Sequence, residues 1–251
     1  GLGPEPCHTV NPALIYGRMT GWGQDGPLAQ TAGHDINYIA ITGVLWSIGA
    51  KEQPPQVPLN LLGDFGGGAS FLVIGLLAGL HAAQTTGHGQ VIDAAICDGV
   101  NTMMGFLRGQ NALGRWDYQR GGNRLDGSAP NYRLYACADG KWLSVGALER
   151  KFFANLLTAL GFAGKDHARL LSLAAPNEVA ETLEAVFRTK TRDDWTAELA
   201  GIDCCAAPVL DPVEALSHPH MAARGLNPVT PTGPQPAPAP RTFPATKGAH
   251  T

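Results

Sequence analysis

The chain has 251 residues and a formal net charge of −3 at pH 7, with 44% hydrophobic and 16% charged residues. This composition is typical of a globular chain with a substantial core and excludes an intrinsically disordered one. The small negative charge gives no general attraction to nucleic acid or to an anionic membrane, so we expect neither nucleic-acid binding nor membrane insertion. The length allows one large domain or two smaller ones.

The cysteines and the missing sequence motifs exclude several kinds of site. The chain has five cysteines, an odd number with no C-x-x-C pair, and two of them, Cys204 and Cys205, are adjacent. We therefore expect reduced thiols and a cytoplasmic protein. No H-E-x-x-H or Cys/His ligand spacing occurs, so we predict no metal site. A serine nucleophile on a G-x-S-x-G elbow is likewise absent from the sequence.

The first half of the chain alternates between strand and helix patterns. The long apolar run that begins at residue 69 is too short to span a membrane comfortably, and we interpret it as a core helix. In chain order we expect a strand at 13–16, a glycine-rich loop at 17–23, a helix at 34–48, a Pro-rich loop at 51–60, a helix at 69–85, a strand at 91–94 and a helix at 96–113.

The second half changes character after a polar stretch at 115–130, where we place a domain boundary. A β-hairpin is predicted at 132–145 around Asp139-Gly140. Helices are expected at 149–160, 177–189 and 193–200, with Asn177 and Thr191 at the starts of the last two. A Pro-rich segment at 228–244 predicts an extended arm. The expected organisation is a large domain at 1–125, a small α+β domain at 126–225 and a C-terminal arm at 226–251 that returns toward the large domain.

Asp64 is the first candidate for chemistry, in the stretch Gly63-Asp64-Phe65-Gly66-Gly67-Gly68 before the apolar helix. One interpretation makes it an N-cap whose carboxylate satisfies free backbone N–H groups. The other uses the glycines, which would expose the backbone and let a substrate approach amides at the positive end of a helix. Such amides would stabilise a developing oxyanion. The pattern alone leaves both interpretations open.

His34 and Glu149 are the other candidates. His34 precedes Asp35 at the start of an apolar segment, and a neighbouring carboxylate would raise the basicity of its imidazole. Glu149 follows a predicted strand and begins a predicted helix. The structural alternatives are a satisfied core histidine for His34 and ordinary first-turn helix charge for Glu149.

Several short motifs in order along the chain resemble those of the α-methylacyl-CoA racemases, which belong to the family III CoA-transferase superfamily. The motifs are Gly33-His34-Asp35-Ile36-Asn37-Tyr38, Gly63-Asp64-Phe65-Gly66-Gly67-Gly68, Thr86-Gly87-His88-Gly89-Gln90-Val91-Ile92-Asp93, Ala138-Asp139-Gly140-Lys141-Trp142-Leu143, Gly146-Ala147-Leu148-Glu149 with Phe152-Phe153, and Arg241 with Gly248-Ala249-His250-Thr251. Each motif alone is weak, and the combination in this order is specific.

The resemblance implies an α/β fold of the family III CoA-transferase type, with a Rossmann-like large domain, here incomplete, plus a small α+β domain. It also implies an interlocked homodimer whose active sites lie between the large domain of one chain and the small domain of the other. The family has a further N-terminal segment, which we expect this chain to lack. The substrate would be an acyl-CoA, and no cofactor is expected because CoA is part of the substrate.

By the same resemblance, His34 and Asp64 are the two bases that epimerise the carbon next to the thioester, and Glu149 hydrogen-bonds His34 and fixes its tautomer. Asp35, Tyr38, Asn60, Gly63 and Tyr132 match substrate-binding positions. Exposed N–H groups at 63–68 would stabilise the enolate, and Met103, Met104 and Phe106 could line an apolar wall or simply fill the core.

Two alternatives remain from the sequence. Family III CoA-transferases use an aspartate at the position of Asp64 as a nucleophile that forms an acyl anhydride. They typically lack the motifs at 33–35 and 146–149, which favours the racemase. The second alternative is an inactive truncated fragment that binds CoA or a partner chain.

Overall fold

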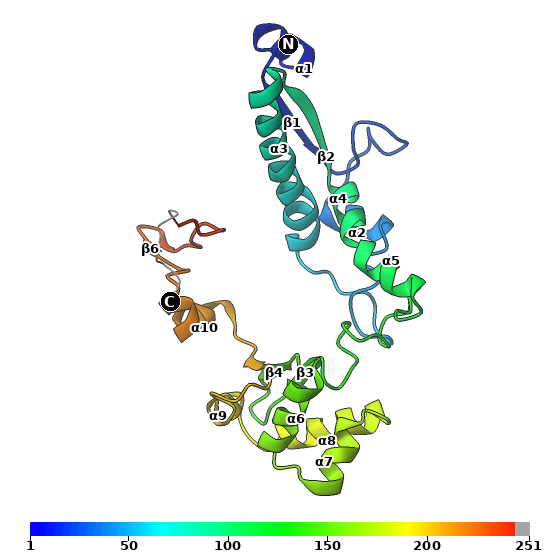
Figure 1. Ribbon diagram of the computed structural model, residues 1–251, viewed down its shortest axis with the longest axis vertical. Helices are drawn as coiled ribbons and strands as arrows, with labels where there is room; N and C mark the ends of the chain where they lie inside the picture. Colours follow the sequence, from blue (N-terminus) through cyan, green and yellow to red (C-terminus); the bar gives the residue numbers. More distant parts are fainter. Residues whose placement is uncertain (244–251) are drawn as a thin grey trace.

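The computed structural model describes residues 1–243 and has mixed helix and strand content (Figure 1). The described elements in chain order are α1 Pro4–Val10, β1 Ile15–Thr20, α2 Asp35–Ile41, the π-helix Leu61–Ala69, α3 Ser70–Thr86, β2 Gln90–Ala95, α4 Ile96–Met103, α5 Gly105–Ala112, β3 Arg133–Ala136, β4 Trp142–Val145, α6 Arg150–Ala159, α7 Gly164–Leu171, α8 Pro176–Phe187, α9 Arg192–Glu198, β5 Ala206–Pro208, α10 Pro212–Ser217, α11 Pro219–Ala223, β6 Val229–Thr230 and β7 Gly233–Pro234. The motif at 248–251 lies outside the described residues.

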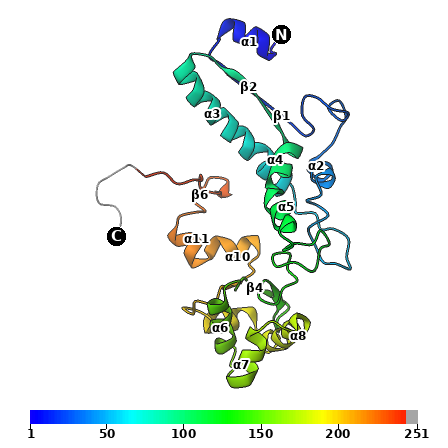
Figure 2. The ribbon, with the colours of Figure 1, turned by 45° about the vertical axis from the view of Figure 1, so that its right-hand side comes forward.

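The first half is built on a β1–α3–β2 unit in which the two strands pair in parallel. Parallel neighbours need a crossover, and α3 supplies it while lying along one face of the strands (Figures 1 and 2). The helix approaches closely because it carries Gly75, where a Cβ would lie 2.5 Å from Cγ2 of Ile92. This arrangement agrees with the predicted α/β class and with the predicted second strand.

The opposite side of α3 has no cover in this chain, so the prediction of a core helix is wrong for the described residues. Val73, Ile74, Leu77 and Leu80 are each more than half exposed. The helical stretch Leu61–Thr86 is long and apolar enough to cross a membrane by length and composition alone. Core helices can meet the same test, so the absence of membrane insertion stays a prediction.

Several element boundaries in the first half differ from those predicted. β1 continues to Thr20, so the predicted loop begins at Gly21, because pairing with β2 keeps the intervening residues extended. α2 is shorter than predicted and ends at Ile41, two residues before Gly43 at φ +83°. The helix expected at 96–113 is two helices divided at Met104. The short helix α1 was not predicted from the sequence.

The second half has its own hydrophobic core. The predicted hairpin is confirmed as antiparallel β3 and β4, and β5 adds a third strand that the sequence analysis missed. Tyr135, Phe187 and Trp195 stack in its centre, with ring centroids 4.8 Å and 5.5 Å apart along the row. A continuous cluster of buried residues runs from the hairpin through α6, α8 and α9.

Of the two predicted helix starts in this half, one is confirmed and one is wrong. Thr191 is confirmed as the N-cap of α9, in a capping box with Asp194. Asn177 is not a cap, because α8 begins one residue earlier at Pro176. Three helices of this half, α7, α10 and α11, were not predicted from the sequence.

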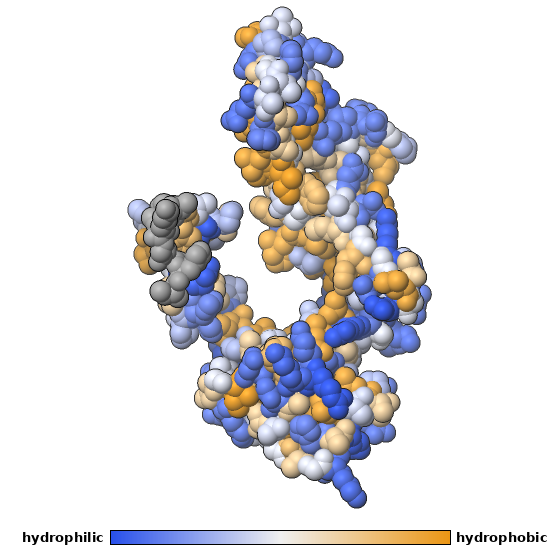
Figure 3. Space-filling model, in the orientation of Figure 1, coloured by the Kyte–Doolittle hydropathy of each residue, from blue (hydrophilic) through white to orange (hydrophobic). Residues whose placement is uncertain are grey.

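The C-terminal segment leaves the second half through α10 and α11 and turns back toward the first half, from which it stays separated (Figures 1 and 2). The space-filling view shows the chain bent around a hollow, with hydrophobic side chains gathered on its α3 side (Figure 3). The last described part forms the short β6–β7 hairpin instead of an entirely extended arm. No observation defines the domain boundaries, which stay a prediction.

One ionic cluster fastens this returning segment to the second half. Glu214 of α10 accepts two hydrogen bonds from the buried Arg192 guanidinium, at 2.7 Å and 2.9 Å, and a third from Lys141 Nζ at 2.6 Å. Arg192 first, and then Lys141, hold the pKa of the Glu214 carboxyl well below its usual range. A lowered pKa means that the folded state favours the ionised carboxylate.

We expect acid to weaken this clamp. The stabilisation from Glu214 is present above its ordinary pKa of 4.5 and is lost as the pH falls toward its lower folded-state pKa. The melting temperature of the unsubstituted chain should therefore drop more than that of Glu214→Gln between about pH 6 and about pH 3. Thermal unfolding across this range measures the difference, with Glu181→Gln as an exposed control. Parallel melting curves for the two chains would contradict the clamp.

Candidate functional site

The predicted bases His34 and Asp64 lie on two elements in direct contact, α2 and the π-helix. His34 is exposed at the N-cap position of α2, where its backbone N–H donates to Oδ1 of Asn37 at 3.1 Å. The histidine is therefore not a core residue. Asn37 therefore helps to hold the backbone of His34, a role that was not predicted from the sequence. A polar side chain three residues after an N-cap is nevertheless a known capping signal.

Asp64 is half-buried in the first turn of the π-helix, and it is not an N-cap. An N-cap at Asp64 would require a helix that begins at Phe65, whereas this helix begins four residues earlier, at Leu61. Its carboxylate Oδ2 accepts a hydrogen bond from Nδ2 of the exposed Asn60 at 3.4 Å. The carboxylate thus stays available at the surface beside α2.

The glycines around Asp64 pack against protein, contrary to the expectation that they expose the backbone. Gly63, Gly67 and Gly68 are buried. A Cβ on Gly67 would lie 2.5 Å from Cγ2 of Val100, and one on Gly63 would lie 2.3 Å from Oδ2 of Asp35. The predicted oxyanion donors at 63–68 are not supported, because α2 and α4 occupy that side of the helix.

Asp35 and Tyr38 support this arrangement from inside α2. Asp35 is 6% exposed, and its Oδ2 accepts the backbone N–H of Asp64 at 2.7 Å. The Tyr38 hydroxyl donates to the carbonyl of Gly33, and its ring meets the Trp22 ring edge-on with centroids 4.7 Å apart. Burial, and then the nearby negative charge of Asp64, raise the pKa of Tyr38, so the phenol stays neutral.

Trp22 is a second residue that the sequence analysis did not single out. Its Nε1 is buried without a hydrogen-bond partner among the described residues. The signal available in the sequence was the Gly21-Trp22-Gly23 run at the end of a strand. The indole packs against the Tyr38 ring and against the backbone at Gly33, the residue before His34.

The remaining predicted residues, Tyr132 and Glu149, belong to the second half. Tyr132 is half-buried in a cavity of about 910 Å³, which Lys51, Ser144 and Cys205 also line. Glu149 is exposed at the N-cap position of α6 and lines a separate cavity of about 490 Å³ with Phe106 and Trp116. Among residues 1–243 no hydrogen bond joins Glu149 to His34, so one chain does not assemble the predicted triad.

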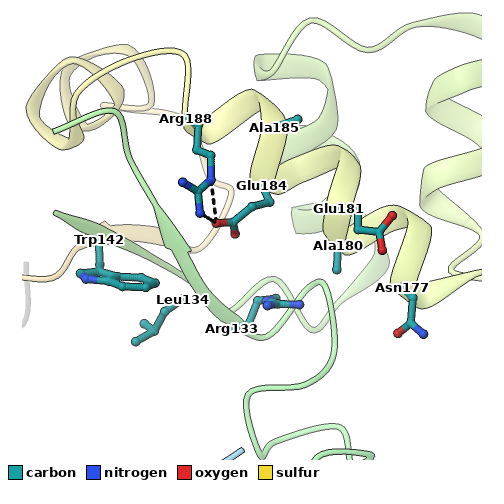
Figure 4. A pocket seen from close by; sticks show the side chains of 9 residues that line it. All are labelled: Arg133, Leu134, Trp142, Asn177, Ala180, Glu181, Glu184, Ala185 and Arg188. Carbon is teal, nitrogen blue, oxygen red and sulfur yellow. Dashed lines mark hydrogen bonds and ion pairs between the residues drawn. The ribbon is translucent and has the colours of Figure 1, made fainter. Parts of the chain in front are cut away.

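A further cavity of about 580 Å³ lies between the hairpin and α8 (Figure 4). The Glu184–Arg188 ion pair spans one side of it, at 2.9 Å, and Trp142 stands at another. None of the predicted site residues lines this cavity. Within residues 1–243 there is also no cluster of three His, Cys, Asp or Glu side chains able to hold a metal ion.

Comparison with known proteins places these features in a family. A sequence model of CoA-transferase family III matches residues 1–251. The chain is 42% identical to mouse alpha-methylacyl-CoA racemase and 41% identical to the human protein, in each case over 89% of this chain. These matches cover 58% of the mouse protein and 59% of the human protein.

The fold is also found among solved structures. A CAIB/BAIF family protein from Brucella suis superposes with a TM-score of 0.77 and 26% identity, covering 97% of this chain and 65% of that one. The chain therefore belongs to CoA-transferase family III.

Proposed function

We propose that the protein is an isomerase that epimerises the 2-methyl centre of branched acyl-CoA thioesters. The observation that carries the proposal is the contact between α2 and the π-helix, which sets His34 and Asp64 on adjoining turns. The relatives named alpha-methylacyl-CoA racemase support the same chemistry. Inverting a carbon needs one base to remove the α-proton and another to return a proton on the opposite face. His34 and Asp64 take these two roles.

Two bases alone cannot make removal of the α-proton fast enough, and the enolate that forms must also be stabilised. A thioester α-proton is less acidic than either base by on the order of ten pK units, which is about 14 kcal/mol uphill at 1.36 kcal/mol per unit. Positioning lowers this barrier in part, and the enolate oxygen needs hydrogen-bond donors for the rest. In residues 1–243 the N–H groups of Asp35 and Ile36, the first two of α2, donate to no protein acceptor and lie beside His34, so we assign this role to them in place of the glycine run.

The substrate must also turn its 2-methyl chain between the two bases. Met103 is half-buried and Phe106 is more than half exposed, so both can offer an adaptable apolar surface. Met104 is buried and belongs to the core. CoA enters as part of the substrate, so we propose no resident cofactor.

We further propose that the active site is completed by a second copy of the chain. Glu149 and Tyr132 lie on the half of the chain opposite the two bases, and the chain bends around a hollow with an uncovered apolar face of α3 beside it (Figure 3). An interlocked homodimer would cover that face and bring Glu149 of the partner subunit to His34. The carboxylate would then fix the tautomer of the imidazole, as in other histidine-base sites.

The test is α-proton exchange with each epimer of a 2-methylacyl-CoA in D₂O, following deuterium at C2 and configuration together. The unsubstituted protein should take up deuterium and lose configuration. His34→Ala and Asp64→Asn should each slow inversion by about 10²- to 10⁴-fold. Each variant should still exchange the α-proton of one epimer, and the epimer that His34→Ala still exchanges should be the one that Asp64→Asn does not.

Equal loss of exchange from both epimers in each variant would contradict the two-base scheme. Transfer of CoA to a free carboxylic acid, without exchange at C2, would identify a CoA-transferase that uses Asp64 as nucleophile. If neither reaction occurs, repeating the assay with a protein of the relatives' full length separates an inactive fragment from a wrong assignment.

Glu149→Gln tests the positioning of His34. We expect kcat to fall by between about tenfold and about 10⁴-fold, the upper figure being the loss on removing the orienting carboxylate of a Ser-His-Asp triad. CoA binding should stay nearly unchanged, because the substitution keeps the size of the side chain. Steady-state kinetics with a CoA-binding titration measure both, and Glu181→Gln is the matched control. A loss of CoA affinity equal to the loss of kcat would instead make Glu149 a binding residue.

A further inference from the structure

Asp35 is the one carboxylate among the buried charged and polar residues of the described chain. Carboxylates are rarely buried without a cation, because desolvation disfavours the charged form. No Lys, Arg or His side chain in residues 1–243 forms an ion pair with Asp35. Its Oδ1 is buried without any hydrogen-bond partner in the described chain. Such a costly placement calls for an explanation other than stability.

The single hydrogen bond that Asp35 accepts suggests the explanation. The donor is the backbone N–H of Asp64, 2.7 Å from Oδ2. This N–H lies in the first turn of the π-helix, where backbone donors lack intrahelical partners and a negative charge is favourable. A charged acceptor also makes the bond stronger than a neutral one. Asp35 therefore satisfies the start of this helix from 29 residues away, a role that the sequence had suggested for Asp64.

The residues on each side of this hydrogen bond allow it to form. Asp35 directly follows His34 and is the first residue of α2. On the other side, Gly63 precedes Asp64, and a Cβ there would lie 2.3 Å from Asp35 Oδ2. Only a residue without a side chain allows the carboxylate to reach the amide. The bond thus joins the residue after one base to the backbone of the other base.

We propose that Asp35 is a positioning residue that sets the separation of His34 and Asp64, in place of a substrate-binding role. This assignment rests on the proposed two-base function. Proton removal needs one base against one face of the substrate, whereas inversion needs both bases at the correct distance across the same carbon. Loss of the Asp35–Asp64 bond should therefore damage inversion more than exchange.

The experiment compares Asp35→Ala with Asp35→Asn in the form of the protein that exchanges deuterium into C2. Asparagine keeps an oxygen that can accept the Asp64 N–H, whereas alanine does not. In Asp35→Ala the ratio of inversion to C2 exchange should fall by roughly tenfold or more, since small misplacements cost up to about 10² in rate. Asp35→Asn should retain most of the ratio. A purely structural loss would lower both rates together and leave the ratio unchanged, which would overturn the assignment.

Gly63→Ala gives a second test that leaves every functional side chain in place, should Asp35→Ala fail to fold. The added methyl group should displace the Asp35 carboxylate and lower the same ratio. Gly109→Ala in α5 is the matched control, because a Cβ there meets nothing within 4 Å. Hydrogen exchange of the Asp64 amide should be faster in Gly63→Ala and Asp35→Ala and unchanged in Gly109→Ala. A protected Asp64 amide in Asp35→Ala would overturn the assignment.

The failure of the inference differs from the failure of the proposed function. If the unsubstituted protein incorporates no deuterium at C2, the two-base function is wrong and the assignment falls with it. If it does incorporate deuterium and inverts, while Asp35→Ala keeps its ratio, only the role of Asp35 is wrong.

Discussion

The close approach of the π-helix to α2 and α4 is the constraint on which the candidate site depends. At Gly63 and Gly67 the helix backbone comes so near its neighbours that any side chain would collide with Asp35 or Val100. Glycine costs helix stability, by about 1 kcal/mol relative to alanine in a helix interior, so this run is an unfavourable choice for the helix itself. What it gives in return is proximity between two backbones, and with it the fixed placement of Asp64 next to the start of α2.

The wide turns of the π-helix also help to place Asp64. π-helices are rare and occur frequently at functional sites, because the extra residue per turn redirects side chains. Here the unusual segment precedes an ordinary α-helix, α3, whose one face rests on β1 and β2. Irregular backbone at the site is thus held by a regular element behind it, which is the general way in which a rigid scaffold supports a reactive group.

The two halves of the chain differ in how complete their packing is. The second half encloses an aromatic and aliphatic core around Phe187, whereas the first half has a small buried cluster around Ile39 and leaves one face of α3 in solvent. Exposed apolar faces of this size mark interaction surfaces in soluble proteins. The two proposed bases lie on the half whose packing is incomplete, so the exposed apolar surface is on the same half of the chain as the proposed site.

The sequence predicted those features that depend on local rules. Alternation and the Asp139-Gly140 turn identified the hairpin, and Thr191 with Asp194 identified the start of α9. It could not predict the end of β1, because an extended Gly17 depends on a partner strand more than seventy residues away. It could not predict the helix start at Leu61 either, since the donor at Asp64 is satisfied by a residue from another element.

The same distinction applies to the candidate site. Motifs in order along the chain selected His34, Asp35 and Asp64, and the structure places Asp35 against the Asp64 backbone, whereas the roles of the three residues stay a prediction. The burial of Asp35, its bond to an amide and the packing of the glycines are tertiary facts that no local pattern contains. The open backbone inferred from the glycines was wrong for this reason: a gap in side chains can admit a ligand or another part of the protein, and sequence does not say which.

This buried bond also bears on the choice between the two reactions of the family. A transferase that attacks through Asp64 needs that carboxylate and has no requirement for a fixed distance to His34. A buried carboxylate without a cation is a costly means of holding a backbone amide in place. The cost is understandable if the distance between His34 and Asp64 itself matters to the reaction. On the two-base proposal, the arrangement supports inversion at carbon over acyl transfer.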